Sequence, residues 1–434
     1  MADALGVLEA RAQFDAPAQE VFVRVAEADG NIYVDLGDEA WRAIKISPTG
    51  WKVVRNPAVR FRRPRGMRPL PRPQRRGSLE ELREFLNVGS DTDWHLVKGW
   101  LVQAMRPTGP YPILAIHGGH GTAKTTFAGV LGKLIDPCTT ELRSEPKEEQ
   151  DLMIAAVNRW ALSFDNLSRL PAWLSDGMCR LATGGGLGKR ELWTDQDEVL
   201  LEAKRPQIMN GIEELATRAD LLDRALILYL PEIPDLRRKG EQGFWADFER
   251  ALPRILGGLL DVLSAGLRNL PTVRLKRLPR MADFARWVTA CEPAFGWPAG
   301  TFLKAYAENR AASHDLTLAA SPVAEPVRAL AEVSGDKGWM GTPTELLKRL
   351  TPSDDEIHRR PSDWPLTPQG LSNALRRVAS NLREVGIVVE FGKHNHKRVI
   401  SINLNPAPIG WGDTLSAAVE RPQSASCWVL RKPH

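Results

Sequence analysis

A glycine-rich turn between two apolar segments constrains this chain more than any other feature. Residues 111–117 are mostly apolar, and residues 126–131 form a second apolar stretch. Between them, residues 118–125 combine three glycines with a lysine and a threonine. This order predicts a strand, a tight turn and a helix. Such a turn lets backbone N–H groups surround a phosphate, and the helix N-terminus adds partial positive charge.

The turn predicts a binding site for ATP and Mg²⁺. Lys124 can reach the β- and γ-phosphates, and the Thr125 hydroxyl can be a Mg²⁺ ligand. Ala123 stands where the usual pattern has a second glycine, and we expect the turn to close because alanine tolerates helical backbone angles there. The alternative is an ordinary glycine turn before a helix. The expected nucleotide-binding residues are Gly118, Gly119, Gly121, Thr122, Ala123, Lys124, Thr125 and Thr126.

Polar or charged residues stand at one end of three further apolar runs. Asp165 and Asn166 follow residues 159–164, and Asp165 is the second expected Mg²⁺ ligand. Asn210 follows residues 206–209 and could orient the attacking water or sense the γ-phosphate. Arg224 precedes the run 225–230, where it could act as an arginine finger on a neighbouring subunit. Arg218 is the competing finger, and an ion pair of Arg224 with Asp220 or Asp223 is the alternative.

The chain divides into segments of different character. Alternation of strands and helices predicts an α/β core with a parallel sheet. Residues 321–405 contain two helical segments and a hairpin with a basic turn, which predicts a winged-helix-like domain. Lys393, Lys397 and Arg398 are its expected DNA contacts, and His394 and His396 are expected to be exposed. The expected units are a β-rich domain (1–63), an Arg/Pro linker (64–77), a helical collar (78–106), the ATPase core (107–232), a helical domain (233–320), the winged-helix-like domain (321–405) and a tail (406–434).

Composition excludes several classes of protein. The 434 residues carry a net charge of +5. The sequence contains no run of eighteen apolar residues, so we expect no membrane span. The N-terminus lacks the pattern of a secretory signal. Four scattered cysteines predict reduced thiols, and together these features predict a cytoplasmic protein. Residues 52–79 contain nine arginines and no acid, so this strip is either a contact for nucleic-acid phosphates or a solvated linker.

The ordered set of a phosphate loop at 118–125, an acid at Asp165 and an amide at Asn210 resembles the superfamily 3 DNA helicases. It also resembles P-loop ATPases that phages and prophages encode beside primases. The resemblance covers about residues 110–232 and implies an AAA+ P-loop core. It further implies a hairpin over residues 184–201 that lines the pore of a hexamer. By this likeness Lys189, Arg190, Lys204 and Arg205 are candidate DNA contacts, with a plain structural hairpin as the alternative.

Two departures from the family pattern affect the chemistry. The expected hairpin tip, residues 194–197, is acidic where relatives place Lys or His. Asn166 stands where a second carboxylate is usual, and an amide cannot be a general base. Either Asp165 serves both the metal and the water, or another acid assists. The candidates are Glu145, Glu148 and Glu213.

The sequence therefore predicts an ATP-dependent DNA helicase or translocase for replication of a phage or mobile element. The expected partners are single-stranded or forked DNA, further copies of the chain and a separate primase, because no primase motif is visible. A second hypothesis is an ATP-switched DNA-binding initiator, loader or defence NTPase without unwinding. A third is a nucleotide-dependent scaffold for a primase with little turnover.

Overall fold

The computed structural model describes most of the chain. Its description covers residues 6–7, 10–11, 14–15, 17, 19–167, 170–185, 187–190, 198–201, 203–211, 219–319, 321–351, 364–394 and 397–405. For residues 187–190, 198–201, 219 and 237 it covers the backbone only. Among the sequence candidates, Arg218, Glu213, His396, the hairpin tip 194–197 and the tail 406–434 lie outside this description.

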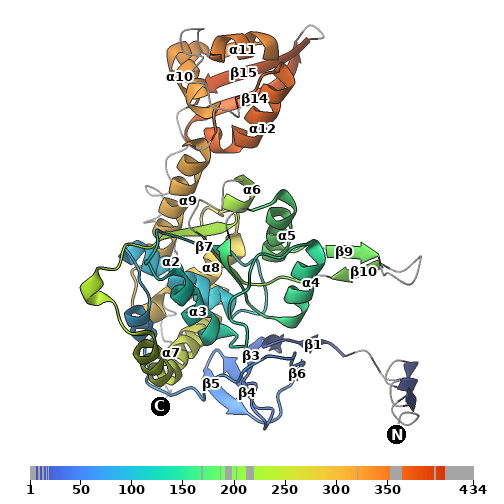
Figure 1. Cartoon of the computed structure of the whole chain (residues 1–434), viewed down its shortest axis with the longest axis vertical. Helices are drawn as coiled ribbons and strands as arrows, with labels where there is room; N and C mark the ends of the chain where they lie inside the picture. Colours follow the sequence, from blue (N-terminus) through green and yellow to red (C-terminus); the bar gives the residue numbers. More distant parts are fainter. Residues whose placement is uncertain are drawn as a thin grey trace, which may run out of the picture.

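A parallel four-stranded sheet forms the centre of the molecule, as the sequence predicts (Figure 1). The spatial order is β12-β7-β11-β8, and every neighbouring pair is parallel. Beyond β8, Arg143 adds one parallel bridge to Phe164, so the chain passes along that edge as a short extra strand. The bounds are β7 (Ile113–His117), β8 (Leu162–Leu167), β11 (Gln207–Gly211) and β12 (Ala225–Tyr229).

Side chains of the sheet alternate between two hydrophobic cores. Leu114 and Ile116 of β7 pack on one face, whereas Ile113 and Ala115 pack on the other. Because both faces are covered, the strands are apolar throughout rather than alternating with polar residues. The first face is covered by α2 (Asp91–Ala104) and α3 (Lys124–Ile135), with α7 (Glu241–Asn269) packed behind α2, and the second by α4 (Glu149–Asn158), α5 (Ala172–Thr183) and α6 (Ala219–Leu222).

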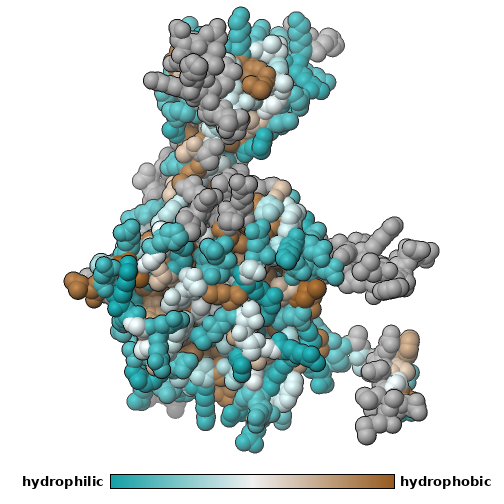
Figure 2. Space-filling model, viewed as in Figure 1, coloured by the Kyte–Doolittle hydropathy of each residue, from teal (hydrophilic) through white to brown (hydrophobic). Residues whose placement is uncertain are grey.

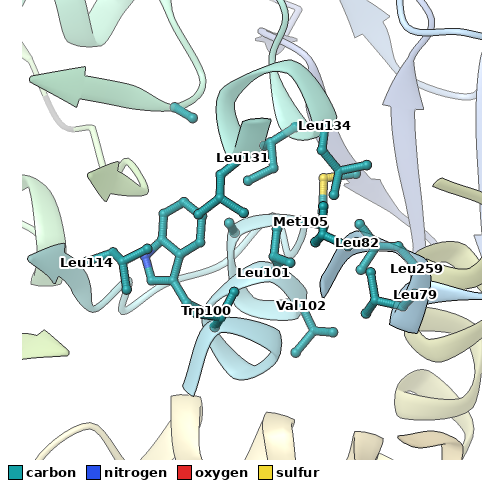
Figure 3. Close-up of a cluster of buried hydrophobic side chains, with 14 of the residues drawn as sticks. Leu79, Leu82, Trp100, Leu101, Val102, Met105, Leu114, Leu131, Leu134 and Leu259 are labelled. Carbon is teal, nitrogen blue, oxygen red and sulfur yellow. The ribbon is translucent and has the colours of Figure 1, made fainter. Parts of the chain in front are cut away.

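Figure 3 shows part of the first core, where Leu131 and Leu134 of α3 lie above Trp100 and Leu101 of α2. Leu79 and Leu82 come from the 3-10 helix η1 (Leu79–Phe85), and Leu259 comes from α7. The predicted collar is thus two short helices with separate serine caps, Ser78 before η1 and Ser90 before α2. Both pack into the hydrophobic core on the first face of the central sheet, so collar and sheet share one hydrophobic interior.

The N-terminal β unit is an antiparallel sheet in the order β2-β3-β4-β5, with a separate parallel pair of β1 and β6. Arg24 ties it to the core: this side chain is fully buried, and its Nε donates to Asp136 Oδ1 at 3.0 Å. Asp136 also accepts from Arg159. The bounds are β1 (Val21–Phe22), β2 (Val25–Ala28), β3 (Asn31–Asp35), β4 (Ala43–Ser47), β5 (Gly50–Val54) and β6 (Arg60–Phe61).

The segment 64–77, expected to be a linker, is packed between its neighbours. Leu70 is buried, and Gln74 donates its backbone N–H to Pro253 of α7. A Cβ at Gly257 would lie 1.7 Å from the Gln74 carbonyl oxygen, so only glycine allows α7 to pass this close. Proline density thus excluded a helix, as expected, but it did not produce a free linker.

Several arginines of the basic strip serve the fold instead of the surface. Arg62 donates to Asn158 and to the Val157 carbonyl, Arg63 forms an ion pair with Asp35, and Arg75 donates to the Trp51 carbonyl. The expectation that the strip contacts phosphates is therefore wrong for these three side chains, because their guanidinium groups already have partners within the protein.

The helical region leads to a C-terminal lobe. The helical region contains α7, α8 (Ala282–Cys291) and α9 (Thr301–Ala319), with the turns η2 (Asp235–Arg237), η3 (Leu270–Thr272) and η4 (Glu292–Phe295). Figure 1 shows α9 as the connection between body and lobe. Near its middle, Asn309 makes two hydrogen bonds to the backbone of Ile227 in the edge strand β12. Further along, the His314 ring contacts the Asn381 amide of the lobe at 2.9 Å.

The C-terminal lobe places three helices against a three-stranded antiparallel sheet of order β13-β15-β14. The predicted helices and hairpin are present, and α10 and β13 are additional. The basic turn is tighter than expected, because Lys393 and His394 already belong to β14, paired with Arg398 and Lys397. The bounds are α10 (Ala324–Ser334), η5 (Gly335–Lys337), β13 (Trp339–Gly341), α11 (Pro343–Leu350), α12 (Pro368–Glu384), β14 (Ile387–His394) and β15 (Lys397–Leu404).

The predicted hairpin is formed by β9 (Leu187–Arg190) and β10 (Glu198–Leu201), which pair antiparallel. In Figure 1 it projects away from the body. Across the described ranges, no helix is both long enough and apolar enough to cross a bilayer.

Candidate nucleotide site

The glycine-rich turn connects the carboxyl end of β7 to the N-terminus of α3. Gly118 has φ +155° and Gly121 has φ +77°, so both use backbone conformations that favour glycine. A Cβ at Gly118 would lie 2.7 Å from the Thr122 hydroxyl and 3.1 Å from the Leu230 carbonyl oxygen. The Thr122 hydroxyl donates to the Gly119 carbonyl and is buried inside the turn. Thr122 therefore supports the loop from within.

Ala123 has a different conformation from the one expected. Its φ and ψ are +62° and 33°, in the left-handed region, so the expectation of right-handed helical angles is wrong. The turn closes nevertheless, because the surrounding structure holds an alanine where glycine would be relaxed. A left-handed non-glycine residue costs about 1–2 kcal/mol. No side chain caps the N-terminus of α3, so its first amides are available to an anion.

Lys124 and Thr125 sit at the first turn of α3. The Lys124 ammonium donates to the carbonyls of Gly118 and Gly119 at 2.7 and 2.8 Å. Burial lowers the pKa of Lys124, and the negative charge of Asp165 opposes that shift. The exposed Thr125 hydroxyl donates to Asp165 Oδ1 at 2.9 Å. The helix and the acidic strand end therefore meet above the carboxyl edge of the sheet.

The spacing of these two oxygens fits a magnesium ion. Neighbouring ligands in an octahedron of about 2.0–2.1 Å radius lie about 2.9 Å apart. Hard oxygen donors from one hydroxyl and one carboxylate are ligands of the type that Mg²⁺ accepts. The uncapped α3 amides and the Lys124 ammonium suit the phosphates that would accompany the metal. The residues present thus fit Mg²⁺ with a nucleoside triphosphate.

Asn166 and Asn210 form a kink beside the acid. Met209 pairs with Phe164 and Gly211 with Leu167, so Asn210 faces both Asp165 and Asn166. The Asn210 Oδ1 accepts the Asn166 N–H at 2.8 Å, and Asn166 is left-handed at φ +54°. Asn210 is 1% exposed, and its Nδ2 has no partner among the described residues. A buried amide donor without a partner is unusual and identifies this position as one that needs an acceptor.

The three additional acids are not equivalent. The backbone of Arg143 pairs with β8 on both sides of Phe164, so Glu145 follows at the same sheet edge as Asp165. Glu148 is exposed at the N-terminus of α4. Glu213 lies outside the described residues. Glu145 is therefore the described acid whose strand position best suits assistance to Asp165.

Arg224 lies at the opposite end of the sheet from the phosphate loop. Its carbonyl accepts the N–H of Ile113, the first residue of β7, whereas the loop follows the last. At about 3.3 Å per residue this strand separates the two sites by more than 13 Å. The Arg224 Nη1 donates to the Asp220 carbonyl, and its buried Nε has no partner among the described residues. Arg224 therefore cannot serve its own loop.

The partners of Asp223 differ from Arg224, with which the alternative interpretation paired it. It forms ion pairs with Arg280 and with Arg310, the latter at 2.8 Å. The sequence did not indicate these two arginines, because Arg280 lies in the turn before α8 and Arg310 in α9, both without any motif. They place additional positive charge at the edge of the sheet that holds Arg224.

Two residues beside the loop also escaped the sequence analysis. Asn87 Nδ2 donates to the carbonyls of Thr122 and Pro231, which fixes the collar to the turn. Arg238 follows β12, and its Nη2 lies 3.4 Å from the position of a Cβ on Gly121. Its partner is Asp235 at 3.0 Å, and both side chains are mostly exposed. The position of Arg238 follows from the strand order, because β12 pairs with β7 and the chain that leaves β12 therefore passes beside the loop.

The candidate DNA contacts differ in their surroundings. Lys204 is exposed next to Gly184 at the base of the hairpin. Arg205 instead donates to the carbonyls of Ala156 and Arg159 and lies over the Trp160 ring. Lys189 and Arg190 face Val199 and Glu198 in the hairpin register. Lys393, Lys397 and Arg398 are exposed on β14 and β15.

Comparison with known proteins identifies the family. The sequence model described as actinomycete integrative conjugative element replication protein matches residues 79–318, more than half of the chain. The chain belongs to this family. A second model, the AICE RepA C-terminal domain, matches residues 323–418. The predicted role in replication of a mobile element agrees with the family description.

The solved structures that resemble this family member are distant. One is the A form apo structure of the NrS-1 C terminal region, at 10% identity, 84% coverage of this chain, 95% of that chain and a TM-score of 0.37. Another is a candidate ATPase from Cytophaga hutchinsonii, at 11% identity, 52% and 83% coverage and a TM-score of 0.31. No curated protein matches the chain.

Proposed function

We propose that this replication protein is a Mg-ATP-dependent DNA translocase of the superfamily 3 type, with a helicase activity that separates forked DNA. The observation that carries the proposal is the hydrogen bond between Thr125 and Asp165, beside a loop whose lysine faces inward. This arrangement supports an ATPase because it gathers the phosphate-binding and metal-binding groups at one edge of a parallel sheet.

Each residue has a proposed task in hydrolysis. When bound, ATP supplies the phosphoanhydride that is cleaved. Lys124 and the α3 amides hold the phosphates, and Thr125 with Asp165 holds the metal. The unpartnered Asn210 amide orients the attacking water. We assign the missing base function to Asp165 assisted by Glu145, because Asn166 is an exposed amide.

Arg238 is proposed as an additional phosphate contact within the same subunit. Its ion pair with Asp235 is exposed, and such pairs contribute about 0–1 kcal/mol. A triphosphate offers Arg238 more negative charge and two oxygens for its planar guanidinium. Breaking the ion pair would therefore cost less than the new contact provides.

Arg224 is proposed to act on the nucleotide of a neighbouring subunit. The length of β7 between Arg224 and the loop of its own subunit supports an action in trans. A ring of subunits, six by the family resemblance, would bring this edge to the loop of the next copy. Arg280 and Arg310 would then lie in the same interface.

The proposed DNA path follows the hairpin β9–β10, which projects from the body. Lys189, Arg190 and Lys204 remain candidate phosphate contacts there. We leave out Arg205, because its donors are occupied within the fold. The order of helices and strands in the C-terminal domain supports a winged-helix domain, with Lys393, Lys397 and Arg398 as its proposed phosphate contacts. A separate primase would supply primers.

The alternatives are an ATP switch and a low-turnover scaffold, and one experiment separates all three. ATPase activity and displacement of a forked duplex are measured for the unaltered chain, Lys124→Ala and Arg224→Ala. The proposal predicts DNA-stimulated hydrolysis and unwinding that both variants lose. Oligomerisation with ATP but no displacement supports the switch, and nucleotide binding without phosphate release supports the scaffold. Full turnover by Lys124→Ala would show that the assignment of the nucleotide site is wrong.

Mixing the two variants tests the interface. An Arg224→Ala subunit keeps an intact loop, and a Lys124→Ala subunit keeps an intact finger. Mixed rings therefore contain some complete sites, and we expect part of the ATPase activity to return. Continued inactivity at every ratio would count against Arg224 acting in trans.

A further inference from the structure

The C-terminal domain contains an acid-free groove of about 810 Å³ between α11, α12 and the hairpin β14–β15. The N-terminal ends of both helices contribute, through Thr344 and Gln369, and β14 and β15 form the other side. Three cations line it, and no acid is among its described lining residues. They are Arg376, Lys393 and Arg398. Both the cations and the helix ends favour a negatively charged occupant.

The outer face of α12 is polar along its length. Leu371, Leu375, Val378 and Leu382 are buried against the domain core. The remaining face exposes side chains at helical spacing, with amides near the N-terminus and arginines beyond them. These are Gln369, Asn373, Arg376, Arg377 and Ser380, followed by Arg383 and Glu384 at the end of the helix. A 17-residue helix with a free polar face can enter the major groove of DNA, which is about 12 Å wide.

The chemistry of this surface disfavours other macromolecules. A protein partner would bury an apolar centre, whereas the exposed helix face carries amides, arginines, a serine and, at its C-terminal end, Glu384. Single-stranded nucleic acid is held by aromatic side chains on which bases stack. The one aromatic residue lining the groove is Phe391, and the Arg376 guanidinium lies over its ring at 4.1 Å. That ring face is therefore already covered.

Hydrophilic residues predominate on the side of the lobe where Figure 1 places β14, β15 and α12 (Figure 2). Lys393 pairs with Arg398 across the hairpin, so the two cations lie next to each other on neighbouring strands. The helix and the hairpin thus present two positive walls with the groove between them. A double helix with phosphates on both sides of its major groove matches that arrangement.

We infer that this surface binds duplex DNA, with α12 in the major groove and the hairpin on the flanking backbone. Gln369 and Asn373 carry the amides that pair with adenine, and Arg377 can contact guanine or a phosphate. Arg376, held against Phe391, and the pair Lys393 and Arg398 contact phosphates. The inference deepens the proposed function, because it names the form of DNA that this domain holds. It requires neither ATP nor a ring.

The experiment uses the full chain without nucleotide. A DNA sequence is first selected from random 30-base-pair duplexes, and its affinity is then measured by fluorescence anisotropy. The same sequence as a single strand and a random duplex serve as comparisons. Variants are Arg376→Gln and Asn373→Ala. The matched control is Lys348→Gln, which removes an exposed cation of α11 that does not line the groove.

We expect Arg376→Gln to weaken duplex binding about tenfold and to reduce its dependence on salt. Asn373→Ala should reduce the preference for the selected sequence about tenfold and leave random duplex binding nearly unchanged. Lys348→Gln should change affinity less than about twofold. Equal or tighter binding of the single strand, or equal effects of Arg376→Gln and Lys348→Gln, would overturn the inference.

Lys124→Ala separates this inference from the proposed function. It should abolish hydrolysis while duplex binding without nucleotide stays as in the unaltered chain. Duplex binding with a failed ATPase assay would remove the proposed function alone. Normal ATPase with no duplex binding, or with binding that no α12 variant changes, would remove this inference alone.

Discussion

The Thr125 hydroxyl donates to the Asp165 carboxylate at 2.9 Å, across 40 positions of sequence. Thr125 belongs to α3 and Asp165 to β8, and β11 separates β8 from the strand that carries the glycine-rich turn. The contact thus shows that the start of α3 reaches past β11 to the end of β8. It also explains why a motif split over two distant segments can act as one metal site.

The first prediction concerns this pair. Asp165→Asn keeps the size of the side chain and removes its charge, so we expect Mg²⁺ to bind about 10–100-fold more weakly. The measurement is the Mg²⁺ concentration at half-maximal ATPase activity. Asp247→Asn, the same change on an exposed face of α7, is the control. An unchanged Mg²⁺ midpoint in Asp165→Asn would show that this carboxylate does not contact the metal or its waters.

The second prediction concerns the left-handed Ala123. Ala123→Gly removes a backbone cost of about 1–2 kcal/mol and adds an unfolded-state entropy cost of about 0.4–1 kcal/mol. We therefore expect a net gain of about 0.5–1 kcal/mol in the free energy of unfolding, seen as a higher thermal midpoint. Ala128→Gly, in the right-handed interior of α3, should destabilise by about 1 kcal/mol or more. The same direction of change in both variants would contradict this account.

The third prediction concerns Arg238. Arg238→Ala should weaken ATP binding about tenfold, because a charge-assisted contact contributes about 1.5–3 kcal/mol. Its neighbour Lys239 lines a groove with Glu81 and Glu84 instead, so Lys239→Ala is a control of equal charge. Affinity for a fluorescent ATP analogue is the measurement. Equal loss in both variants would indicate a general effect of charge and not a contact by Arg238.

The fourth prediction concerns stability against pH. Burial raises the pKa of Glu292 to about 7, although its two oxygens accept the N–H groups of Gly300 and Phe302. Between pH values of about 4.5 and 7 the folded state holds a proton that the unfolded state has lost, so stability falls as pH rises. The fall from this group is of the order of 3 kcal/mol.

Glu292→Gln tests that assignment because an amide does not titrate. The free energy of unfolding, from urea titrations, should nearly match that of the unaltered chain at pH 4 and exceed it at pH 8. The variant keeps an acceptor for one of the two N–H groups. A stability difference that stays constant over this range would mean that Glu292 does not titrate there.

The sequence predicted the core of the site because its residues stand directly at strand and helix ends. Apolar runs locate β7, β8 and β11, and the polar residue after each run is then fixed at the sheet edge. Parallel pairing brings these ends together without further information. The loop, Asp165 and Asn210 were accessible from the sequence for this reason.

The remaining features depend on contacts between distant segments. Nothing near Arg238 in the sequence indicates that it lies beside Gly121, and the Asn87 contact depends on how the collar packs. The arginines of the basic strip look free in the sequence, but Arg63 meets Asp35 only in the folded chain. The left-handed Ala123 also follows from closure of the whole turn, which overrides the local preference of alanine.

The α9 helix joins the edge of the central parallel sheet to the C-terminal lobe. Asn309 holds it to β12, and His314 meets Asn381 five residues further on. From Asn309 to Ala319 the helix rises about 15 Å, so a tilt of about 10° at Asn309 displaces its last residue by about 2.6 Å. A small rearrangement of the outermost strand would thus reach the lobe as a displacement similar in size to the rise between adjacent DNA base pairs, about 3.4 Å.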